Sequence, residues 1–591
     1  MTAPKRRPMT GEQAQWDVII CGGGMAGLTL ARQLRLEWPS LRVAVAERTR
    51  RPIPASCHKV GESNAELGSQ YLERLGLREY LRREHVVKLG LRFFPGGGTL
   101  PLERRTEIGP MLEPVVKGYQ IDRGRFEQDL RGMVEEQGVT LWEGTMVRDL
   151  QLGGEGPHAV VLEREGERMR QTTRWVVDAT GRSGLLRRRF GSKRAVMHAG
   201  NAGWFRVEGR LRLDELTAEP TAQWREAPLA SERWRSTTHL MGVGYWVWII
   251  ALPGERTSIG VVTQDELHGF DRVRTHARVM AFLREHEPAL AERLALAELL
   301  DFRCIRHYSY GIERSWSAER WAVVGEAGVF ADPLYSPGTD FIALSNCSTV
   351  ELLRAEAAGE DLEARAESLD RQFREHVEGS LSVYRRAAPI YGHARAMASK
   401  VYWDNFAYWS YTCQYFLQGI YRAQGELEAA VTRVRARFIE LSGHVQALLS
   451  AWATAHPEPP RGGFSSTPPF PSLSVDAHLD LQKSLDPAQT LALMQTRLGQ
   501  GEQMVAELVV RLMLELGPHD GARVLEAAGV PLADLPLDPA RAQAEPTVGL
   551  ARRRALSRVS RDVERALGRV PRHPQWAEAL ERLFGANPAH A

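Results

Sequence analysis

The sequence predicts an α/β fold that combines a parallel sheet, a second sheet inserted into the same domain, and a helical C-terminal region. Three observations predict this fold. The segment from Trp16 reads as strand, glycine turn, helix and second strand (WDVIIC, GGGMAG, LTLARQLRLEW, LRVAVAE), which is the order of a βαβ unit. Apolar and polar residues alternate from about 140 to 178 and from 203 to 263, as expected for a sheet apart from the first. A helical pattern with many aromatic residues follows from about 343 to 455.

The apolar run WAVVGEA near Gly325 has the continuous pattern of a buried parallel strand. The first domain is therefore expected to be assembled from distant segments, with the second sheet as an insertion. The predicted organisation is a nucleotide-binding domain at 14–345 with an insert at about 85–120 and 195–310, an aromatic-rich helical region at 346–455, a linker rich in Pro, Gly and Ser at 456–474, and a helical C-terminal extension at 475–591.

Composition and charge narrow the class of protein. The formal net charge of +3 gives no electrostatic reason to expect nucleic acid. The basic start of the chain is not followed by the apolar stretch of a signal peptide, and no apolar run is long enough to cross a bilayer. We therefore expect a cytoplasmic protein without membrane contact. No metal site is expected, because metal-binding spacing is absent among the five cysteines, Cys21, Cys57, Cys304, Cys347 and Cys413.

A G-x-G-x-x-G motif lies directly between the first strand and the first helix. Its glycines permit a tight turn and let a pyrophosphate approach the helix N-terminus, where unpaired N–H groups point outward. A carboxylate at the end of the second strand accepts hydrogen bonds from ribose hydroxyls and disfavours a 2′-phosphate. The sequence therefore predicts a bound dinucleotide without that phosphate, contacted by Gly22, Gly24, Met25, Ala26, Gly27 and Glu47.

Two further segments, VVDATGRSG and VVGEAGVFADP, resemble the ATG and GD motifs of FAD-dependent monooxygenase-like proteins. The resemblance implies a Rossmann-like domain that binds FAD rather than NAD. The second motif usually carries Asp after its glycine, and here Glu326 takes that place. An Arg near the cofactor is also common in this group, although a surface Arg at a helix start is an equal alternative. The additional contacts implied are Arg123, Arg125, Asp178, Gly181, Gly325, Glu326, Pro333 and Gly338.

The run GYWVWIIALP resembles the W-x-W-x-I-P motif of the flavin-dependent halogenases. Trp246 and Trp248 would share one face of a strand and form a wall of two indoles. The resemblance implies that this wall keeps the organic substrate away from the flavin. Ala251 stands where the family has Pro, and two core tryptophans are the alternative reading.

A second run, KVGESNAELGSQYLERLGLREYLRREHVVKLGLRFF, resembles the family's G-E-(S/A) loop, the following helix and its catalytic lysine. Gly61, Glu62 and Ser63 would lie beside the flavin, and Lys88 aligns with the lysine. Apolar surroundings would lower the pKa of Lys88 and make its amine a hydrogen-bond donor and a nucleophile. Lys59 is the competing candidate, and a solvated surface charge is the alternative for either residue.

The third segment, ADPLYSPGTDFIALSN, resembles the halogenase segment that passes the isoalloxazine ring and binds halide. Gly338 and Thr339 can offer backbone N–H groups to an anion at a helix start, whereas Pro337 cannot. Tyr335 stands where the tryptophan halogenases carry a Glu that assists the lysine. The resemblance therefore implies the non-tryptophan subgroup, which acts on phenols or pyrroles.

The resemblance covers residues 14–345 and, more loosely, the chain to about 455. It implies FADH2-dependent halogenation of an electron-rich aromatic compound in secondary metabolism, such as antibiotic biosynthesis. A separate flavin reductase would supply FADH2, O2 would give a flavin C4a-hydroperoxide, and chloride or bromide would give hypohalous acid, which Lys88 directs at the ring. The substrate is either free or carrier-bound, and a homodimer is an open alternative. An NAD(P)H-dependent aromatic hydroxylase and a non-catalytic flavin-binding protein are the rival interpretations.

Overall fold

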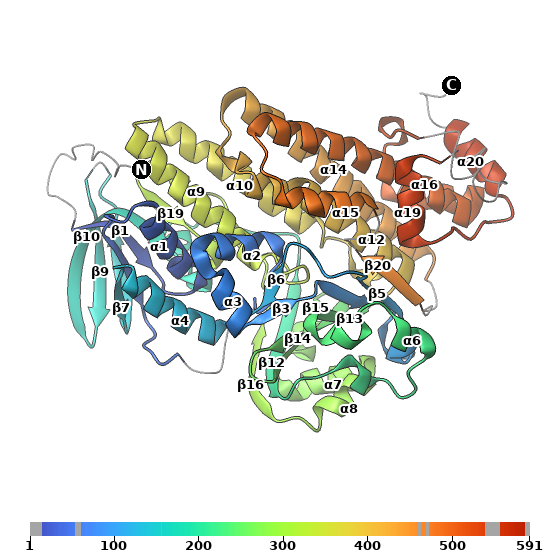
Figure 1. The fold of residues 1–591 in the computed structure, drawn as a ribbon, viewed down its shortest axis with the longest axis horizontal. Helices are drawn as coiled ribbons and strands as arrows, with labels where there is room; N and C mark the ends of the chain where they lie inside the picture. The colour runs from blue at the N-terminus through green and yellow to red at the C-terminus, as the bar shows by residue number, and fades with distance from the viewer. Residues whose placement is uncertain are drawn as a thin grey trace.

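The computed structural model describes residues 15–53, 61–154, 156–457, 463–467, 472–537 and 556–585. Two sheets lie below a layer of long helices, and the C-terminal helices sit at one end of that layer (Figure 1). The predicted α/β class with a Rossmann-like domain, an inserted sheet and a helical C-terminal region is confirmed. Among the described helices, none has the length and apolar character needed to cross a membrane.

The first sheet has eight strands in the order β18-β19-β10-β1-β2-β7, with β9 pairing antiparallel to β10 and β8 to β9. Strands β19, β10, β1, β2 and β7 run parallel. Helix α1 packs on β2 and against α4. The bounds are β1 Trp16–Cys21, α1 Met25–Glu37, β2 Val43–Glu47, α4 Arg123–Glu136, β7 Thr140–Glu143, β8 Thr145–Gln151, β9 His158–Arg164, β10 Glu167–Asp178, β18 Trp316–Ser317 and β19 Trp321–Val323.

The strands from 140 to 178 belong to this first sheet, so the prediction that they form part of a separate one is wrong. β7 extends the parallel sheet beside β2, and the last residues of β10 pair with β1 and are buried. The alternation that suggested another sheet comes from the half-exposed antiparallel part of β8, β9 and β10. Alternating apolar and polar residues indicate that one face of a strand is exposed to solvent, but they do not identify the sheet to which the strand belongs.

The second sheet has the order β16-β12-β15-β14-β13-β4-β5-β20 and is covered on one face by α7 and α8. Alternate residues of β14 enter two different cores. Val247 and Ile249 join the core that includes residues of α7 and α8, whereas Trp246 and Trp248 join the main core of the molecule. The bounds are β4 Leu91–Phe94, β5 Thr106–Pro110, β12 Gly200–Glu208, β13 Thr237–Gly242, β14 Tyr245–Leu252, β15 Arg256–Gln264, α7 His276–His286, α8 Pro288–Leu294, β16 Leu299–Ile305 and β20 Gly463–Thr467.

Strand β20 lies inside the segment predicted to be a linker. Its residues pair in parallel with β5 at the edge of the second sheet. An edge strand needs hydrogen bonds on one side only, so a short GFSST segment between prolines can occupy this position. The Pro-rich composition predicts a linker, and it gives no sign of a strand whose pairing partner, β5, is distant in the sequence.

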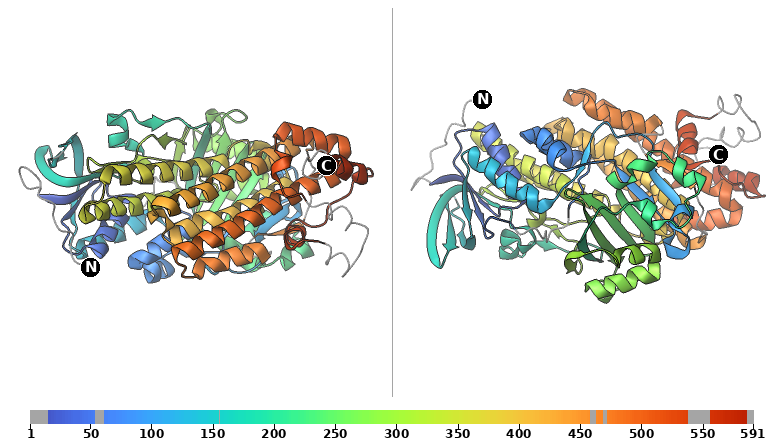
Figure 2. Two further views of the ribbon diagram at one scale, coloured as in Figure 1. Left: turned by 90° about the horizontal axis from the view of Figure 1, so that it is seen from above. Right: turned by 60° about the horizontal axis from the view of Figure 1, so that its bottom comes forward.

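Long helices lie side by side and join the first sheet to the C-terminal extension (Figure 2). The extension packs on α14 and is tied to α12 by the Tyr402 hydroxyl, which donates to Asp562 Oδ2 at 2.8 Å. The C-terminal extension is therefore packed against the helical region and does not form a separate domain. The bounds are α9 Gly338–Ala358, α10 Leu362–Ser382, α11 Ala388–Tyr391, α12 Ala394–Ala407, η9 Tyr408–Cys413, α13 Gln414–Leu417, α14 Gly425–Ala455, α15 Ser472–Leu479, α16 Pro487–Ala528, α19 Arg558–Leu567 and α20 Trp576–Gly585.

Shorter elements complete the surroundings of the candidate site. Helix α2 contacts α9, and the two-stranded sheet of β3 and β6 lies next to α2 and α3. The bounds are α2 Glu66–Leu72, α3 Arg78–Glu84, β3 Val86–Lys88, β6 Gly118–Gln120, α5 Leu185–Arg189, β11 Lys193–Arg194, α6 Ala222–Glu226 and β17 Gly311–Ile312.

Candidate active site

A cavity of about 640 Å³ opens at the carboxyl ends of the parallel strands, and we call it the glycine-loop cavity. Gly22 has φ +117°, and a Cβ there would lie 2.3 Å from the carbonyl oxygen of Ala179. A Cβ on Gly27 would lie 2.0 Å from the carbonyl oxygen of Gly22. Only glycine therefore allows the first turn of α1 to approach this loop so closely, as a pyrophosphate site requires.

Glu47 ends β2 at the rim of this cavity. Its Oε2 accepts the backbone N–H of Gly23 at 2.7 Å, and its Oε1 accepts that of Thr49 at 2.8 Å. These bonds fix the carboxylate next to the glycine turn, where a ribose can reach it. The predicted residues that line the glycine-loop cavity are Gly22, Gly24, Met25, Ala26, Glu47, Arg123, Gly181 and Glu326.

Four predicted cofactor residues do not line the cavities of this site. Gly27 and Gly325 act through close packing, because a Cβ on Gly325 would lie 2.9 Å from Ala26 Cβ. The buried Asp178 carboxylate accepts N–H and O–H groups of the turn that follows it, including Leu186 N at 2.7 Å. Arg125 pairs with Glu84 at the surface, whereas Arg123 is buried at the cavity.

A smaller cavity of about 60 Å³, the tryptophan cavity, adjoins the first and shares Arg123, Glu326, Phe330 and Ile342 with it. The other predicted residues that line the tryptophan cavity are Gly61, Glu62, Ser63, Trp246, Trp248, Pro333, Gly338 and Thr339. The structure thus brings together residues that lie nearly 280 positions apart in the chain. Glu62 is buried, and burial raises the pKa of its carboxyl to about 7.

The two indoles lie side by side on β14, with ring centroids 5.8 Å apart and planes inclined at 45°. Both are buried, and Trp248 Nε1 donates to Ser258 Oγ at 3.1 Å. A Cβ on Gly260 would lie 2.2 Å from the Trp248 ring, so a glycine on the neighbouring strand β15 makes room for this indole. The pair is therefore held rigidly at the edge of the tryptophan cavity.

Lys88 ends β3 and lines a third cavity of about 190 Å³, which we call the lysine cavity. Only 3% of the residue is exposed, and Nζ donates to the carbonyl oxygen of Asn64 at 3.2 Å. The lysine cavity and the tryptophan cavity share Pro337 and Phe341 as lining residues. The amine is thus inside the protein and next to the tryptophan cavity.

Two carboxyl groups set the charge around Lys88. Burial lowers the pKa of Lys88 to about 8, and the charges of Glu66 and Asp340 oppose that shift. Asp340 accepts from Gly68 N and from the Tyr408 hydroxyl, each at 2.8 Å, and burial raises its pKa to about 7. Burial also raises the pKa of Glu66. The amine and Asp340 can therefore exchange a proton near neutral pH.

Sequence reasoning missed Glu66, Asp340 and Asn64. Both acids occupy the first turn of a helix, where Asp and Glu are common because of the helix dipole, so they carried no distinct signal. The two helix starts meet closely, since a Cβ on Gly68 would lie 2.7 Å from Thr339 Cβ. The side chain of Asn64 joins them by accepting the Thr339 hydroxyl at 2.7 Å.

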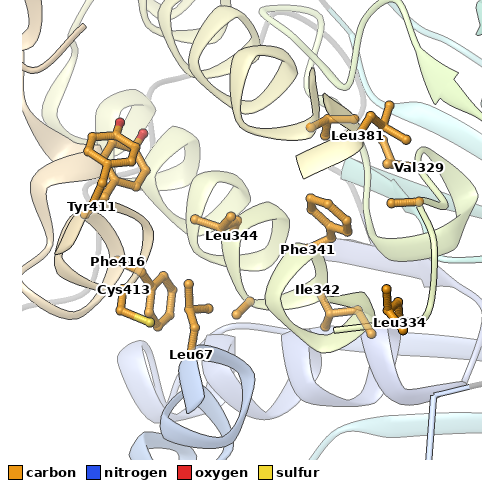
Figure 3. Close-up of a cluster of buried hydrophobic side chains, with 14 of the residues drawn as sticks. Leu67, Val329, Leu334, Phe341, Ile342, Leu344, Leu381, Tyr411, Cys413 and Phe416 are labelled. Atoms are coloured by element: carbon orange, nitrogen blue, oxygen red, sulfur yellow. The ribbon is translucent and has the colours of Figure 1, made fainter. Parts of the chain in front are cut away.

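Figure 3 shows Ile342 near Leu334 on one side of the buried cluster and Tyr411 on the other, with Leu344 between them. Phe341, on the same helix, lines both the tryptophan cavity and the lysine cavity. Apolar side chains of α9 therefore line both cavities, Ile342 the tryptophan cavity and Leu344 the lysine cavity.

Tyr335 lines the lysine cavity, and its hydroxyl donates to Asp404 Oδ2 at 2.8 Å. Asp404 in turn pairs with the buried Lys400 at 2.8 Å. The position that carries Glu in tryptophan halogenases thus holds a phenol anchored to α12. The competing candidate Lys59 lies outside the described residues.

Comparison with known proteins agrees with this geometry. A family model described as "FAD binding domain" matches residues 15–267. The flavin-dependent halogenase chlA of Dictyostelium discoideum is 27% identical over 428 residues, which cover 67% of this chain and 70% of that protein. These matches support the flavin-dependent halogenase family for this chain. This halogenase is therefore an oxidoreductase that uses FAD, and the family and cofactor predicted from the sequence are confirmed.

Other proteins are similar to part of this chain in sequence or in structure. The 1H-pyrrole-2-carbonyl-[peptidyl-carrier protein] brominase of Pseudoalteromonas luteoviolacea is 24% identical over 353 residues, 59% of this chain and 80% of that protein. The solved structure of halogenase PltM with phloroglucinol and FAD matches with a TM-score of 0.56 and 17% identity over 83% of this chain and 96% of that chain, which shows a shared fold.

Proposed function

We propose that this halogenase attaches chloride or bromide to an electron-rich aromatic ring held in the lysine cavity, with Lys88 as the catalytic residue. The observation that carries the proposal is the buried amine of Lys88, which lines a cavity that meets the tryptophan cavity at Pro337 and Phe341. An amine in that position can receive a small oxidant from one side and a ring from the other.

The glycine-loop cavity and the tryptophan cavity together offer the groups that FAD requires. The glycine turn and the start of α1 would hold the pyrophosphate, and Glu47 would hold the ribose. Reduced FAD with O2 would supply the two-electron oxidant that turns halide into hypohalous acid. Backbone N–H groups of Gly338 and Thr339, at the start of α9, would bind the halide anion.

The paired indoles favour halogenation over direct hydroxylation. Trp246 and Trp248 line the tryptophan cavity but not the lysine cavity, so they would separate the flavin from the organic ring. Hypohalous acid would have to pass Pro337 and Phe341 to reach Lys88. Below a pH of about 8 the ammonium form of Lys88 can donate a hydrogen bond to the acid, and above it the neutral amine can take the halogen as a haloamine.

The substrate class follows from the walls of the lysine cavity. Aromatic side chains such as Tyr384, Tyr408 and Phe438 line it, and Tyr335 stands in place of the Glu of tryptophan halogenases. We propose a phenol or pyrrole substrate outside the tryptophan subgroup. A pyrrole carried by a peptidyl carrier protein is what one relative acts on. A separate flavin reductase would supply FADH2, while a homodimer and a cytoplasmic location stay predictions.

The test uses the FAD-loaded protein with a flavin reductase, NADH, air, bromide and a panel of phenols, followed by mass spectrometry. The expected result is an aryl bromide from the wild type and none from Lys88→Ala, with FAD still bound. Lys483→Ala is the matched control, because its side chain is 59% exposed. A bromide-independent hydroxylated product would instead indicate a hydroxylase, and the absence of any product would indicate a flavin-binding protein.

A further inference from the structure

The helical wall of the lysine cavity carries a basic side chain that the proposed chemistry does not use. Arg435 on α14 lines the cavity together with His376 on α10 and Tyr411 on η9. Their exposed fractions are 1%, 8% and 5%, so all three lie inside the protein. Lys88 comes from β3, so the polar groups of the helical wall are distinct from the amine and its carboxyl neighbours.

Hydrogen bonding at this wall is incomplete within the part of the chain that the structure describes. Both ring nitrogens of His376 have no hydrogen-bond partner there, and Nε and Nη1 of Arg435 make no well-formed hydrogen bond, although the guanidinium interacts with the nearby Tyr411 hydroxyl. Nη2 of Arg435 pairs with Glu375 and donates to Thr432 Oγ1 at 3.2 Å. Buried N–H groups almost always find an acceptor, so donors that face a cavity indicate a ligand with acceptor atoms.

The charge balance favours an anionic ligand. A guanidinium stays charged, and the carboxylate that pairs with it, Glu375, has a side chain that is 37% exposed and therefore partly hydrated. Burial lowers the pKa of His376 to about 3, so the imidazole is neutral and can donate one N–H. The Tyr411 phenol is held protonated, because burial raises its pKa to about 12 despite the nearby Arg435. Arg435, His376 and Tyr411 can thus each donate to an oxyanion, whereas the carboxylate of Glu375, which lines the same cavity, competes for Arg435.

The same wall also carries aromatic rings on which a ligand ring can pack. The His376 ring lies 5.6 Å from Tyr411 and 4.6 Å from Tyr415, and Tyr411 lies 5.8 Å from Phe438. Figure 3 shows Tyr411 on the opposite side of Leu344 from Ile342 and Leu334. Rings arranged in this way contact an aromatic ligand edge-on or with an offset stack.

We infer that the substrate of this halogenase is a free aryl carboxylic acid, whose carboxylate binds Arg435 while its ring reaches toward Lys88. This inference rests on the proposed function, which assigns the halogenated ring to the lysine cavity. A carrier-bound acyl thioester has no carboxylate to offer, so the inference selects the free acid over a carrier-bound substrate. Arg435 is then a specificity-determining residue, and His376 and Tyr411 assist it by donation.

The experiment measures binding by calorimetry to the holoenzyme with oxidised FAD, without turnover. The probes are 4-hydroxyphenylacetic, 3-(4-hydroxyphenyl)propanoic and 4-(4-hydroxyphenyl)butanoic acids, each with its primary amide. One acid of this series should bind the wild type about 10- to 100-fold more tightly than its amide, as a charge-assisted hydrogen bond allows. Arg435→Met should abolish the preference, whereas Arg433→Met, at an exposed position of the same helix, should keep it.

A second variant keeps the inference testable if Arg435→Met does not fold. Glu375→Gln removes the carboxylate that competes for Arg435, so it should strengthen binding of the acid several-fold and leave the amide unchanged. The inference is overturned if no acid binds, if acid and amide bind the wild type equally, if the preference survives Arg435→Met, or if Glu375→Gln gains nothing. Acid preference without any halogenation would overturn only the proposed function, and halogenation of neutral phenols without acid preference would overturn only this inference.

Discussion

Replacing Lys88 by Met should remove halogenation and at the same time raise the stability of the folded protein. Burial lowers the pKa of Lys88 from its ordinary value of 10.5 to about 8, because the ammonium form loses its hydration. At neutral pH the folded state therefore carries a charge that is more stable in the unfolded chain. Methionine has a similar length and no charge, so it can fill the same space.

The size of the effect follows from the pKa difference. A shift of about 2.5 units corresponds to a cost of up to about 3 kcal/mol in the free energy of folding. For a chain of 591 residues that melts as one unit, this is a rise of about 3 °C in the melting temperature. The lost hydrogen bond from Nζ to Asn64 O offsets part of the gain, by about 1 kcal/mol.

The pH dependence of the melting temperature tests independently whether Lys88→Met stabilises the folded protein. Since the pKa is lower in the folded state, the cost is fully present below pH 8 and falls as pH rises from 8 to 10.5, where the unfolded chain also loses its proton. The melting temperature of FAD-loaded Lys88→Met should exceed that of the wild type most at pH 7 and converge with it near pH 10.5. A difference that is absent at pH 7, or that grows with pH, would refute the reasoning. Lys483→Met is the exposed control.

Three further substitutions test the cofactor loop, the indole wall and the carboxyl neighbours of Lys88. Gly27→Ala should abolish FAD retention, read from the flavin absorbance of the purified protein, because its Cβ would lie 2.0 Å from the carbonyl oxygen of Gly22. Trp248→Ala should cost about 3–5 kcal/mol of stability and yield hydroxylated product by mass spectrometry, since it opens the wall; unchanged product would contradict the role of the wall. Glu66→Gln should lower the pKa of Lys88 further, because it removes a negative charge nearby. The rate of amine acylation against pH measures this shift, and an unmoved midpoint would show that Glu66 does not act on the amine.

Local sequence could predict those parts of the fold that depend on neighbours in the chain. The glycine turn between Trp16 and Glu47 was predictable because strand, turn and helix follow one another and each needs particular residues. The sheet to which the strands of 140–178 belong was not predictable. Which strands pair depends on segments far apart in the sequence, and strands of either sheet have similar polarity. Strand β20 illustrates the same limit, since only β5 makes its short segment a strand.

The residues of the candidate site also fall into those that local sequence could predict and those that it could not. Lys88 and the two indoles could be predicted because they lie in segments that resemble known motifs. The acids near Lys88 could not, because Glu66 and Asp340 start helices that are far apart in sequence and meet only after folding. Arg435 gave no signal at all, because a single Arg in a long amphipathic helix is typical of a solvated surface.

Under the proposed function, halide binding and the protonation of Lys88 would be physically linked. The segments that border the tryptophan cavity, 61–63 and 336–339, lead into α2 and α9, whose first turns carry Glu66 and Asp340. The Thr339 hydroxyl donates to Asn64 Oδ1, and the carbonyl oxygen of Asn64 accepts the Lys88 amine. A negative charge at the start of α9 would therefore act on Asp340 directly and on the amine through Asn64. A halide at the start of α9 would then favour the charged form of the amine that meets the oxidant, so halide binding and the protonation of Lys88 would promote each other.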